Sequence, residues 1–367
     1  MTNRRIQTTH VGSLPRPEAI RDRLSQPGSA AADDLDAAIT EAVRSVVRRQ
    51  AEVGLDIGNN GEQSRLAYSV DVTNRLSGFS DEFAERRLPA DLAEFPEFAD
   101  RLFGDIDMIG GPIATGPIAY EGEAALEAEL TRFEDAVEAE GVQFDAAFHT
   151  APSPGAVLRF TESQYHESTE AYLYDLAEAL AAEYALIVDH GLILQIDAPE
   201  LLAGYTITYK DATVQEFRQH VATYIDAINT ALSGVSSEDV RLHACWGNYP
   251  GPHHHDVALA DVIDEFYAAD VSGLIIEGAN PRHQHEYKTF AEHPLPADWT
   301  LIPGVIDVKT NIIEHLEVVP ARLEPFATTG RGKVGEGSKT EFYSLERERS
   351  GRDRTARQIL EEVTERY

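Results

Sequence analysis

The sequence predicts one α/β domain over residues 1–367, a TIM (β/α)8 barrel with an insertion at about residues 81–120. Short apolar runs alternate with amphipathic helical stretches along the chain, which is typical of parallel α/β proteins. The apolar runs also end in polar or glycine-rich residues, as strands do at the mouth of a barrel that carries chemistry. An open doubly wound sheet is the alternative, but no Gly-x-Gly-x-x-Gly follows the first strand.

Eight apolar runs are expected to form the strands. They are Thr8–Ser13, Leu55–Gly61, Ala147–Pro152, Leu192–Pro199, Val240–Gly247, Gly273–Gly278, Leu301–Asp307 and Lys333–Gly337. Amphipathic patterns predict helices most clearly at Asp36–Ala51, Glu167–His190, Thr213–Leu232 and Leu259–Ala269. From Asp81 to Tyr120, scattered Pro, Phe and Gly fit neither the strand period nor the helical period. We therefore expect an insertion there, between the second and third βα units.

Composition indicates a reducing compartment. The hydrophobic share of 43% is enough for a large core, and a single cysteine excludes a disulfide framework. No apolar segment follows Met1–Arg5, so no secretory signal is expected. No stretch approaches the ~18 apolar residues of a membrane helix. We therefore expect a cytoplasmic protein that does not bind a membrane.

The charge balance is strongly acidic. The net charge is −32, from 63 acidic and 31 basic residues, and only five of the basic residues are lysines. Nucleic-acid binding needs a cationic surface, so this balance argues against it. An excess this large indicates a halophilic protein from a salt-rich cytosol, where the Debye length shrinks to ~3 Å at 1 M salt. The alternative is an ordinary acidic cytosolic enzyme.

Cys245 follows His243 by two residues in a run that reads as a strand. Residues two apart on a strand point to the same face, so the imidazole and the thiol should project together. A zinc ion can bridge such a pair, and Glu277, near the end of the next apolar run, can supply a third ligand. The alternative is a small buried cysteine beside a strand histidine, since free cysteines are usually buried.

In a barrel, the residues at the ends of the strands converge on one mouth. The candidates are His10, Gly12, Ser13, Asn60, Glu62, Ser153, Gln195, Asp197, His243, Cys245, Glu277, Asp307, Lys309 and Glu336. Several carboxylates beside a His/Cys pair are a poor choice for stability alone, because buried charges cost several kcal/mol each unless they are paired or bind metal. Asp307 has a structural alternative, in which it caps a loop.

Six motifs, in this order, resemble the cobalamin-independent methionine synthase family in its catalytic C-terminal barrel. They are Thr8–Arg16, Asn60–Arg65, Gln195–Pro199, His243–Cys245, Ile276–Glu277 and Pro303–Asp307. The segments Trp246–Tyr249 and Asn280–Glu286 are most similar to the single-barrel branch, which includes the epoxyalkane:coenzyme M transferases.

The resemblance implies zinc-dependent transfer of a methyl or small alkyl group from a small-molecule donor to a thiol, with homocysteine as the acceptor in methionine biosynthesis. It implies zinc ligation by His243, Cys245 and Glu277, with Glu336 standing where the family has a second cysteine. Ser13, Glu62 and Asp197 then bind the amino-acid end of homocysteine. The expected catalytic residues are Lys309, where the synthases carry a proton-transferring histidine, and Asp307. The class of enzyme is that of 5-methyltetrahydropteroyltriglutamate–homocysteine S-methyltransferases, without their second barrel.

Three other functions remain open at this stage. The first is an epoxyalkane:coenzyme M transferase-like reaction. The second is a uroporphyrinogen-decarboxylase-like barrel, which needs arginines at the mouth, where the candidates are Arg16, Arg65 and Arg282. The third is a degenerate barrel that binds a small molecule or metal without turnover. The sequence does not indicate an oligomeric state.

Five further histidines invite a metal interpretation. His253, His254 and His255 are consecutive in a predicted loop, and consecutive residues do not easily share one ion. His283 and His285 follow Glu277 closely, and they either face the mouth or serve the structure, by orienting Glu277 or capping a helix.

Overall fold

The computed structural model describes residues 6–24, 32–65, 71–85, 87–103, 109–310, 312–331 and 342–343. Its centre is a curled parallel sheet in the strand order β10-β9-β8-β7-β5-β2. The strands are β2 (Ile57–Gly58), β5 (Ala146–Pro152), β7 (Ile193–Asp197), β8 (Val240–Ala244), β9 (Gly273–Glu277) and β10 (Thr300–Gly304). Each overlaps a predicted run, most runs extending two or three residues past the strand that forms, and every neighbouring pair is parallel. The predicted α/β class is confirmed.

A further parallel pair flanks this sheet. β1 (Thr8–Thr9) pairs with β11 (Phe342–Tyr343). The backbone N–H of Asp56 donates to the Thr8 carbonyl at 3.1 Å, which joins β1 to the start of β2, and β11 lies against β10. The sequence predicted the eighth strand at 333–337, which lies outside the described residues, whereas the strand that pairs with β1 comes later in the chain. A pair of aromatic residues is too short to show the periodicity on which strand prediction depends.

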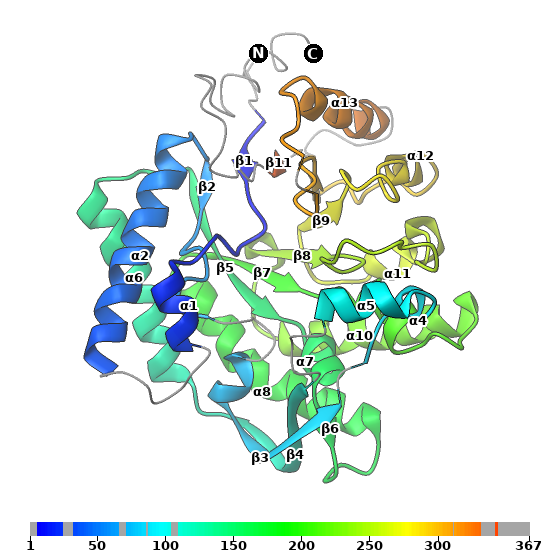
Figure 1. The fold of residues 1–367 in the computed structure, drawn as a ribbon, viewed down its shortest axis with the longest axis horizontal. Helices are drawn as coiled ribbons and strands as arrows, with labels where there is room; N and C mark the ends of the chain where they lie inside the picture. Colours follow the sequence, from blue (N-terminus) through cyan, green and yellow to red (C-terminus); the bar gives the residue numbers. More distant parts are fainter. Residues whose placement is uncertain are drawn as a thin grey trace.

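Helices cover the outer face of the sheet, and neighbours in the chain pack side by side (Figure 1). In order of contact they are α2 (Ala32–Glu52), α6 (Glu123–Glu140), α8 (Thr169–Asp189), α10 (Val214–Ala231) and α11 (Ile263–Phe266). Further α-helices in the described ranges are α1 (Glu18–Leu24), α7 (Pro154–Phe160), α9 (Gly204–Ile207), α12 (Thr289–Glu292) and α13 (Val318–Arg331). Short 3-10 turns are η1 (Val72–Arg75), η2 (Pro199–Leu201), η3 (Ser237–Asp239), η4 (Leu259–Asp261) and η5 (Glu286–Lys288).

Local signals explain several helix boundaries. Thr213 and Glu216 form a capping box at the start of α10, which satisfies backbone donors that have no partner within the helix. Ser168 caps α8 in the same sense, accepting from the Ala171 N–H at 3.0 Å. The predicted continuous helix over 259–269 is instead divided between η4 and α11.

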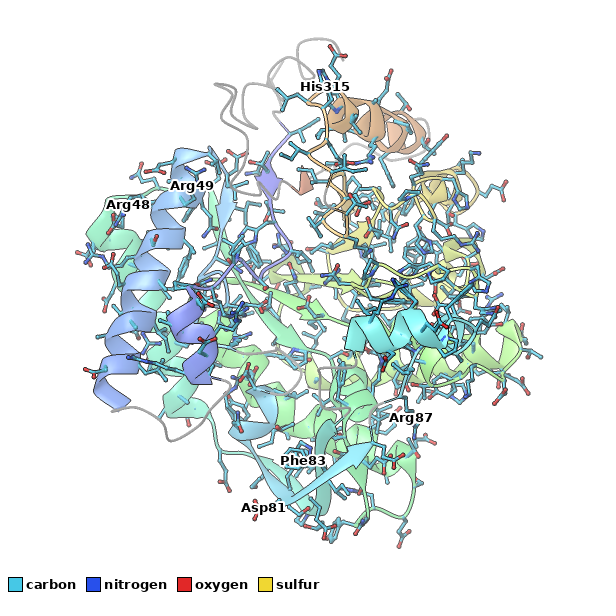
Figure 2. All side chains as sticks on the ribbon, in the orientation of Figure 1. Arg48, Arg49, Asp81, Phe83, Arg87 and His315 are labelled. Atoms are coloured by element: carbon cyan, nitrogen blue, oxygen red, sulfur yellow. The ribbon has the colours of Figure 1, made fainter. Side chains whose placement is uncertain are left out.

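The expected insertion is a hairpin with two short helices at its tip. β3 (Leu76–Glu85) runs antiparallel to β4 (Ile109–Tyr120), and β6 (Glu162–Ser163) adds to the other edge of β4. α4 (Ala90–Ala93) and α5 (Pro96–Phe103) lie between β3 and β4 in the chain. The hairpin begins earlier than predicted, and it lies between β2 and α6, within the second βα unit rather than after it. Figure 1 shows this small sheet apart from the parallel strands, with Asp81 and Phe83 on it in Figure 2.

Strand alternation divides apolar from polar side chains and so positions the site. Leu194, Ile196 and Leu242 are fully buried in the main hydrophobic core. The residues between them point to the opposite face, because successive side chains of a strand alternate. There Gln195 Nε2 donates to the Val11 carbonyl at 2.6 Å, and Arg241 Nε donates to Gln195 Oε1 at 3.1 Å. The same alternation brings Asp197 of β7 and His243 of β8 to this polar face.

None of the helices in the described part of the chain combines the length and the apolar character that a membrane span requires.

Candidate active site

A cavity of about 480 Å³ lies at the carboxyl ends of the parallel strands. The sequence-predicted residues that line it are Ser13, Arg16, Glu62, Asp197, His243, Cys245, Glu277 and Lys309. Asp197 and Glu277 are the last residues of β7 and β9, while Cys245 directly follows β8. Residues spread over almost 300 positions of sequence therefore meet in one place, because the carboxyl ends of parallel strands face the same side of a sheet.

His243 connects a carboxylate to the single thiol. Its Nδ1 lies 2.8 Å from Asp197 Oδ1, and its imidazole is also hydrogen bonded to Cys245. Burial lowers the pKa of His243, but the hydrogen bonds to Asp197 and Cys245 outweigh it and raise that pKa to about 10. Burial raises the pKa of Cys245, but the neighbouring His243 more than offsets this and lowers it. Both shifts favour the imidazolium and the thiolate, and the thiolate is the nucleophilic and metal-binding form of a cysteine sulfur.

Glu277 is held by an internal cation. Lys309 Nζ donates to Glu277 Oε2 at 2.8 Å, while the backbone N–H groups of Ala279 and Asn280 donate to Oε1 at 3.0 and 3.2 Å. Burial raises the pKa of Glu277, but Lys309 outweighs it and the pKa lies below its ordinary value. The charge of Lys309 also lowers the pKa of Cys245. One cation thus acts on both the carboxylate and the thiol.

Glu62 enters the cavity from the loop after β2 with a strained backbone, at φ 53°. Thr150 Oγ1 donates to its Oε1 at 3.0 Å, and Arg16 Nη2 lies 3.8 Å from its Oε2. Burial raises the pKa of Glu62, Arg65 offsets part of this, and the Asp197 carboxylate raises it further. Glu62 and Asp197 both line the cavity and are close enough for the charge of Asp197 to shift the pKa of Glu62. Two such carboxylates are suited to binding one cation together.

Gly12 explains why the first motif contains a glycine beside this carboxylate. Its φ is +137°, and a Cβ built there would lie 2.7 Å from Glu62 Oε1 and 2.8 Å from Thr150 Cγ2. Both the backbone conformation and the close approach therefore require a residue without a side chain.

Asp307 and Arg65 do not line the cavity, and a third predicted residue, Glu336, is not described. Asp307 is not among the residues that line the cavity; its Oδ1 accepts from the Lys309 backbone N–H at 2.9 Å, which fixes the turn that presents Lys309. Glu336 lies outside the described residues, so its part in metal binding remains a prediction. Arg65, a candidate for the mouth, instead forms a buried ion pair with Glu129 at 3.0 Å.

The five further histidines separate into different environments. His253 and His283 are buried and both contact Asp256, while His285 is exposed. His254 and His255 are exposed and pair with Glu94. His253 is thus separated from its two neighbours, whereas His254 and His255 lie on the same carboxylate, so the expectation that consecutive histidines do not easily share one ion stays a prediction.

Sequence reasoning missed the far wall of the cavity. The hairpin and α7 supply Arg87, Leu88, Arg159 and Phe160, and Tyr249 comes from the loop after β8. Figure 2 marks Arg87, where the chain leaves β3. These residues lie in aperiodic or helical segments. The signal used to predict the site, a polar residue at the end of an apolar run, therefore does not reveal them.

The structure describes three of the predicted zinc ligands, and two of them, His243 and Cys245, are well suited to zinc. A carboxylate that holds one ring nitrogen of a histidine, as Asp197 does, is the usual partner of a metal-bound imidazole, and the Cys245 thiolate is a preferred zinc ligand. Glu277 is occupied by Lys309. Within the described ranges, two groups of three side chains bring their ligand atoms within 4.8 Å of one another, and both lie elsewhere: Glu94–His254–His255 and His253–Asp256–His283. Glu277 can therefore join a zinc ion only by exchanging Lys309 for it.

The fold and cavity define an α/β enzyme with a thiol-containing site at its strand ends, and the comparisons give its family. Residues 97–333 match the family described as "Cobalamin-independent synthase, Catalytic domain", and the chain belongs to that family. It is 25% identical over 322 residues to the methionine synthase of Sulfolobus acidocaldarius, covering 86% of this chain and 78% of that protein. It is also 25% identical over 329 residues to that of Saccharolobus islandicus, covering 86% and 81%.

Two solved structures share the fold. A B12-independent methionine synthase from Shewanella sp. W3-18-1, in complex with selenomethionine, has a TM-score of 0.71 at 17% identity, covering 99% of this chain and 97% of that one. A putative vitamin-B12 independent methionine synthase from Listeria monocytogenes has a TM-score of 0.62 at 19% identity, covering 99% and 96%. Both alignments extend over the sheet, the helices and the hairpin of the described chain.

Proposed function

We propose that this protein is a zinc-dependent S-methyltransferase that methylates the thiol of homocysteine to give methionine. The observation that carries the proposal is the His243–Cys245 pair, which shares one cavity with the carboxylates of Glu62 and Asp197. The names of the similar methionine synthases favour the same reaction. A closed (β/α)8 barrel, with β1 beside β2 and β11 beside β10, is the architecture we propose around this cavity.

One group of residues binds the amino-acid end of homocysteine, and another group holds the zinc ion that binds its thiol. Glu62 and Asp197 hold the ammonium group, and Ser13 lies at the same wall to contact the amino-acid end. Bound zinc supplies Lewis acidity, which keeps the acceptor sulfur deprotonated and nucleophilic at neutral pH. His243 and Cys245 are the ligands, with Asp197 fixing the imidazole so that Nε2 remains available. Glu277 is the third ligand and Glu336 the fourth.

Lys309 and Asp307 complete the proposed catalytic set. The Lys309 ammonium lies beside Glu277 and lowers the pKa of Cys245, so it stabilises negative charge at the sulfur end of the cavity. Asp307 acts through the backbone, since its carboxylate holds the Lys309 N–H. We assign Lys309 as the group that balances charge while the sulfur loses its negative charge to the incoming methyl group.

Glu62→Gln should weaken the binding of homocysteine more than it slows turnover. Losing one charge-assisted contact to the ammonium costs about 1.5–3 kcal/mol, or roughly a 10- to 150-fold rise in KM. Because burial raises the pKa of Glu62, the wild-type KM should begin to rise at a higher pH than an ordinary glutamate would give, as acidification protonates this carboxylate. Steady-state kinetics across pH measure both effects.

Glu85→Gln is the matched control, because Glu85 lines the same cavity from the hairpin. An unchanged KM in Glu62→Gln, or an equal rise in both variants, contradicts the assignment of the ammonium site.

Lys309→Met should tighten zinc binding by at least about tenfold. Methionine keeps the length of the side chain but removes a positive charge beside the proposed ligands, and it frees Glu277 Oε2. A unit charge at 4 Å contributes about 4 kcal/mol at an effective dielectric of 20, so even a partial effect exceeds the 1.4 kcal/mol that corresponds to tenfold. Competition with a chromophoric chelator measures the dissociation constant. Lys288→Met, a change at an exposed lysine, should leave it unchanged; weaker zinc binding in Lys309→Met would show that Lys309 positions Glu277 instead.

The reaction itself is tested by following methionine formation from homocysteine and a methyl donor with zinc-loaded protein. Coenzyme M, a thiol that carries a sulfonate and no ammonium group, is assayed in parallel. Homocysteine should be preferred, since two carboxylates face the acceptor. A preference for coenzyme M contradicts the homocysteine assignment, and the absence of product with either thiol contradicts the transferase.

We further propose a cytoplasmic protein adapted to high salt, on the basis of its net charge of −32. Self-repulsion of the acidic surface should be relieved as potassium chloride rises to molar concentration. The midpoint of thermal unfolding should therefore increase by about 1–3 °C, as ~1–2 kcal/mol of added stability implies for a chain of 367 residues. A midpoint that is constant or falls with salt contradicts this adaptation.

A further inference from the structure

Behind the cavity wall, two histidines from different loops converge on one carboxylate. His253 Nδ1 and His283 Nε2 each lie 2.8 Å from the same oxygen, Asp256 Oδ2. The side chains are 2%, 3% and 1% exposed for His253, His283 and Asp256, respectively. The His283 ring stacks on Trp246, with 3.7 Å between centroids and 8° between planes. The group is therefore shielded from solvent, and it shares no side chain with the His243–Cys245 pair.

Hydrogen bonding alone leaves this group incomplete. His253 Nε2 lies 3.0 Å from the Tyr249 carbonyl oxygen, which can only accept a hydrogen bond. Both ring nitrogens of His253 must then carry protons, which places an imidazolium in the interior. Even so, Asp256 Oδ1 and His283 Nδ1 are buried without any hydrogen-bond partner within the described residues. A buried polar atom without a partner costs about 1–3 kcal/mol.

A metal ion in place of the two inward protons satisfies the same atoms. His253 becomes neutral, with Nδ1 as a ligand and Nε2–H donating to the Tyr249 carbonyl. His283 uses Nε2 as a ligand and turns Nδ1–H toward Glu286 Oε1, 3.7 Å away. A backbone carbonyl and a carboxylate are the partners that metal-bound histidines usually have on their second nitrogen. Asp256 Oδ1 becomes a second carboxylate ligand atom.

We propose that His253, Asp256 and His283 form a binding site for a divalent transition-metal ion, with zinc the best fit to two imidazoles and one carboxylate. Their ligand atoms already lie within 4.8 Å of one another. Zinc bonds of ~2.0–2.1 Å in tetrahedral geometry need ligand atoms about 3.3 Å apart, so the 2.8 Å contacts must open by roughly 0.5 Å. His253 has a φ of 54°, a strained conformation that ligation would hold in place.

Burial makes this site structural rather than catalytic, because no substrate reaches it. Two of its ligands, His253 and Asp256, belong to the segment 246–256. Gly247, Asn248 and Tyr249 of the same segment line the cavity. The backbone N–H of His253 donates to Asp91 Oδ2 at 2.8 Å, and the Tyr249 hydroxyl donates to both oxygens of that carboxylate. An ion here ties the loop after Cys245 to the loop that carries His283, and Asp91 of α4 contacts the first of these loops. Glu94, His254 and His255 form an exposed group, so they are excluded from this role.

The test measures bound metal in Cys245→Ala, which lacks the sulfur of the proposed catalytic site. Metal-free protein is reconstituted with Co²⁺, dialysed and analysed for metal content and visible absorption. Cys245→Ala should retain one equivalent, with the spectrum of a nitrogen and oxygen site and no thiolate-to-metal charge-transfer band. Asp256→Asn keeps the shape of the side chain but removes its charge, and it should lose one equivalent from the wild-type and the Cys245→Ala protein alike.

His254→Ala/His255→Ala is the matched control and should retain the metal. His283→Gln, with circular dichroism to verify folding, provides a second variant in case Asp256→Asn does not fold. Absence of bound Co²⁺ in folded Cys245→Ala, or its retention in Asp256→Asn, overturns the proposal. Failure of the proposed catalytic zinc site has a different signature, since the wild-type protein then lacks the charge-transfer band while the nitrogen and oxygen spectrum persists.

Discussion

Replacing Cys245 with serine is expected to reduce methyl transfer by about 10³-fold or more. Serine has nearly the same shape, but its hydroxyl does not ionise at neutral pH and is a poor zinc ligand. A catalytic metal contributes several kcal/mol to the transition state, which corresponds to a factor of this size when the site loses it. The zinc content of the thiol site should fall together with activity, while thermal stability changes little because Cys245 is only partly buried.

Alkylation of the same residue gives an independent measure of its ionisation. Cys245 is the only cysteine, so iodoacetamide labels one position. Because His243 lowers the pKa of Cys245, the labelling rate of metal-free protein should fall only at pH values below the range of a free thiol, near 8.5. Zinc should protect the residue. A Cys245→Ser variant with wild-type activity, or a labelling profile like that of a free thiol, contradicts the role we assign to the sulfur.

Breaking the buried pair between Arg75 and Glu183 is expected to have the largest effect on stability. Arg75 Nε and Nη2 donate to the two oxygens of Glu183 at 2.9 and 2.7 Å, and the Glu183 side chain has no exposed surface. The pair connects η1, at the base of the hairpin, to α8. Glu183→Gln leaves the guanidinium without its counter-charge, which costs about 3–5 kcal/mol in buried pairs. Urea unfolding measures the change in free energy.

Glu178→Gln, on an exposed face of the same helix, is the control and should cost less than about 0.5 kcal/mol. The double variant Arg75→Met/Glu183→Leu should recover part of the loss, since an apolar pair of similar volume leaves no buried charge. A Glu183→Gln cost below about 1 kcal/mol would show that the pair does not anchor the hairpin.

The parallel strands were predictable because each is a buried apolar run, and their polar ends followed from the geometry of parallel sheets. Asp197 and Glu277 thus reach one cavity as predicted, at the ends of β7 and β9. The hairpin was recognised only as aperiodic, because the two faces of β3 are not divided regularly into buried and exposed positions. The short β11 offered no pattern at all.

Site residues could be predicted where their type is unusual at the end of a strand. Those supplied by a helix or by the hairpin could not be predicted. Arg159 lines the cavity from the last turn of α7. A basic residue at that position of a helix is ordinarily predicted to lie on the surface. The contact between Lys309 and Glu277 joins residues from different strand ends, and neither motif alone implies it. Glu336 precedes β11 in the chain, whereas the sequence prediction placed it at the end of an eighth strand.

X-ray absorption at the zinc edge, recorded without and with homocysteine, tests the central claim most directly. With zinc confined to the thiol site by the Asp256→Asn change, the free protein should show one sulfur neighbour, Cys245. A second sulfur neighbour should appear when homocysteine is added, because the acceptor thiol binds the ion. A zinc ion without sulfur neighbours, or a coordination shell that homocysteine leaves unchanged, would contradict methyl transfer to a zinc-bound thiol at His243 and Cys245.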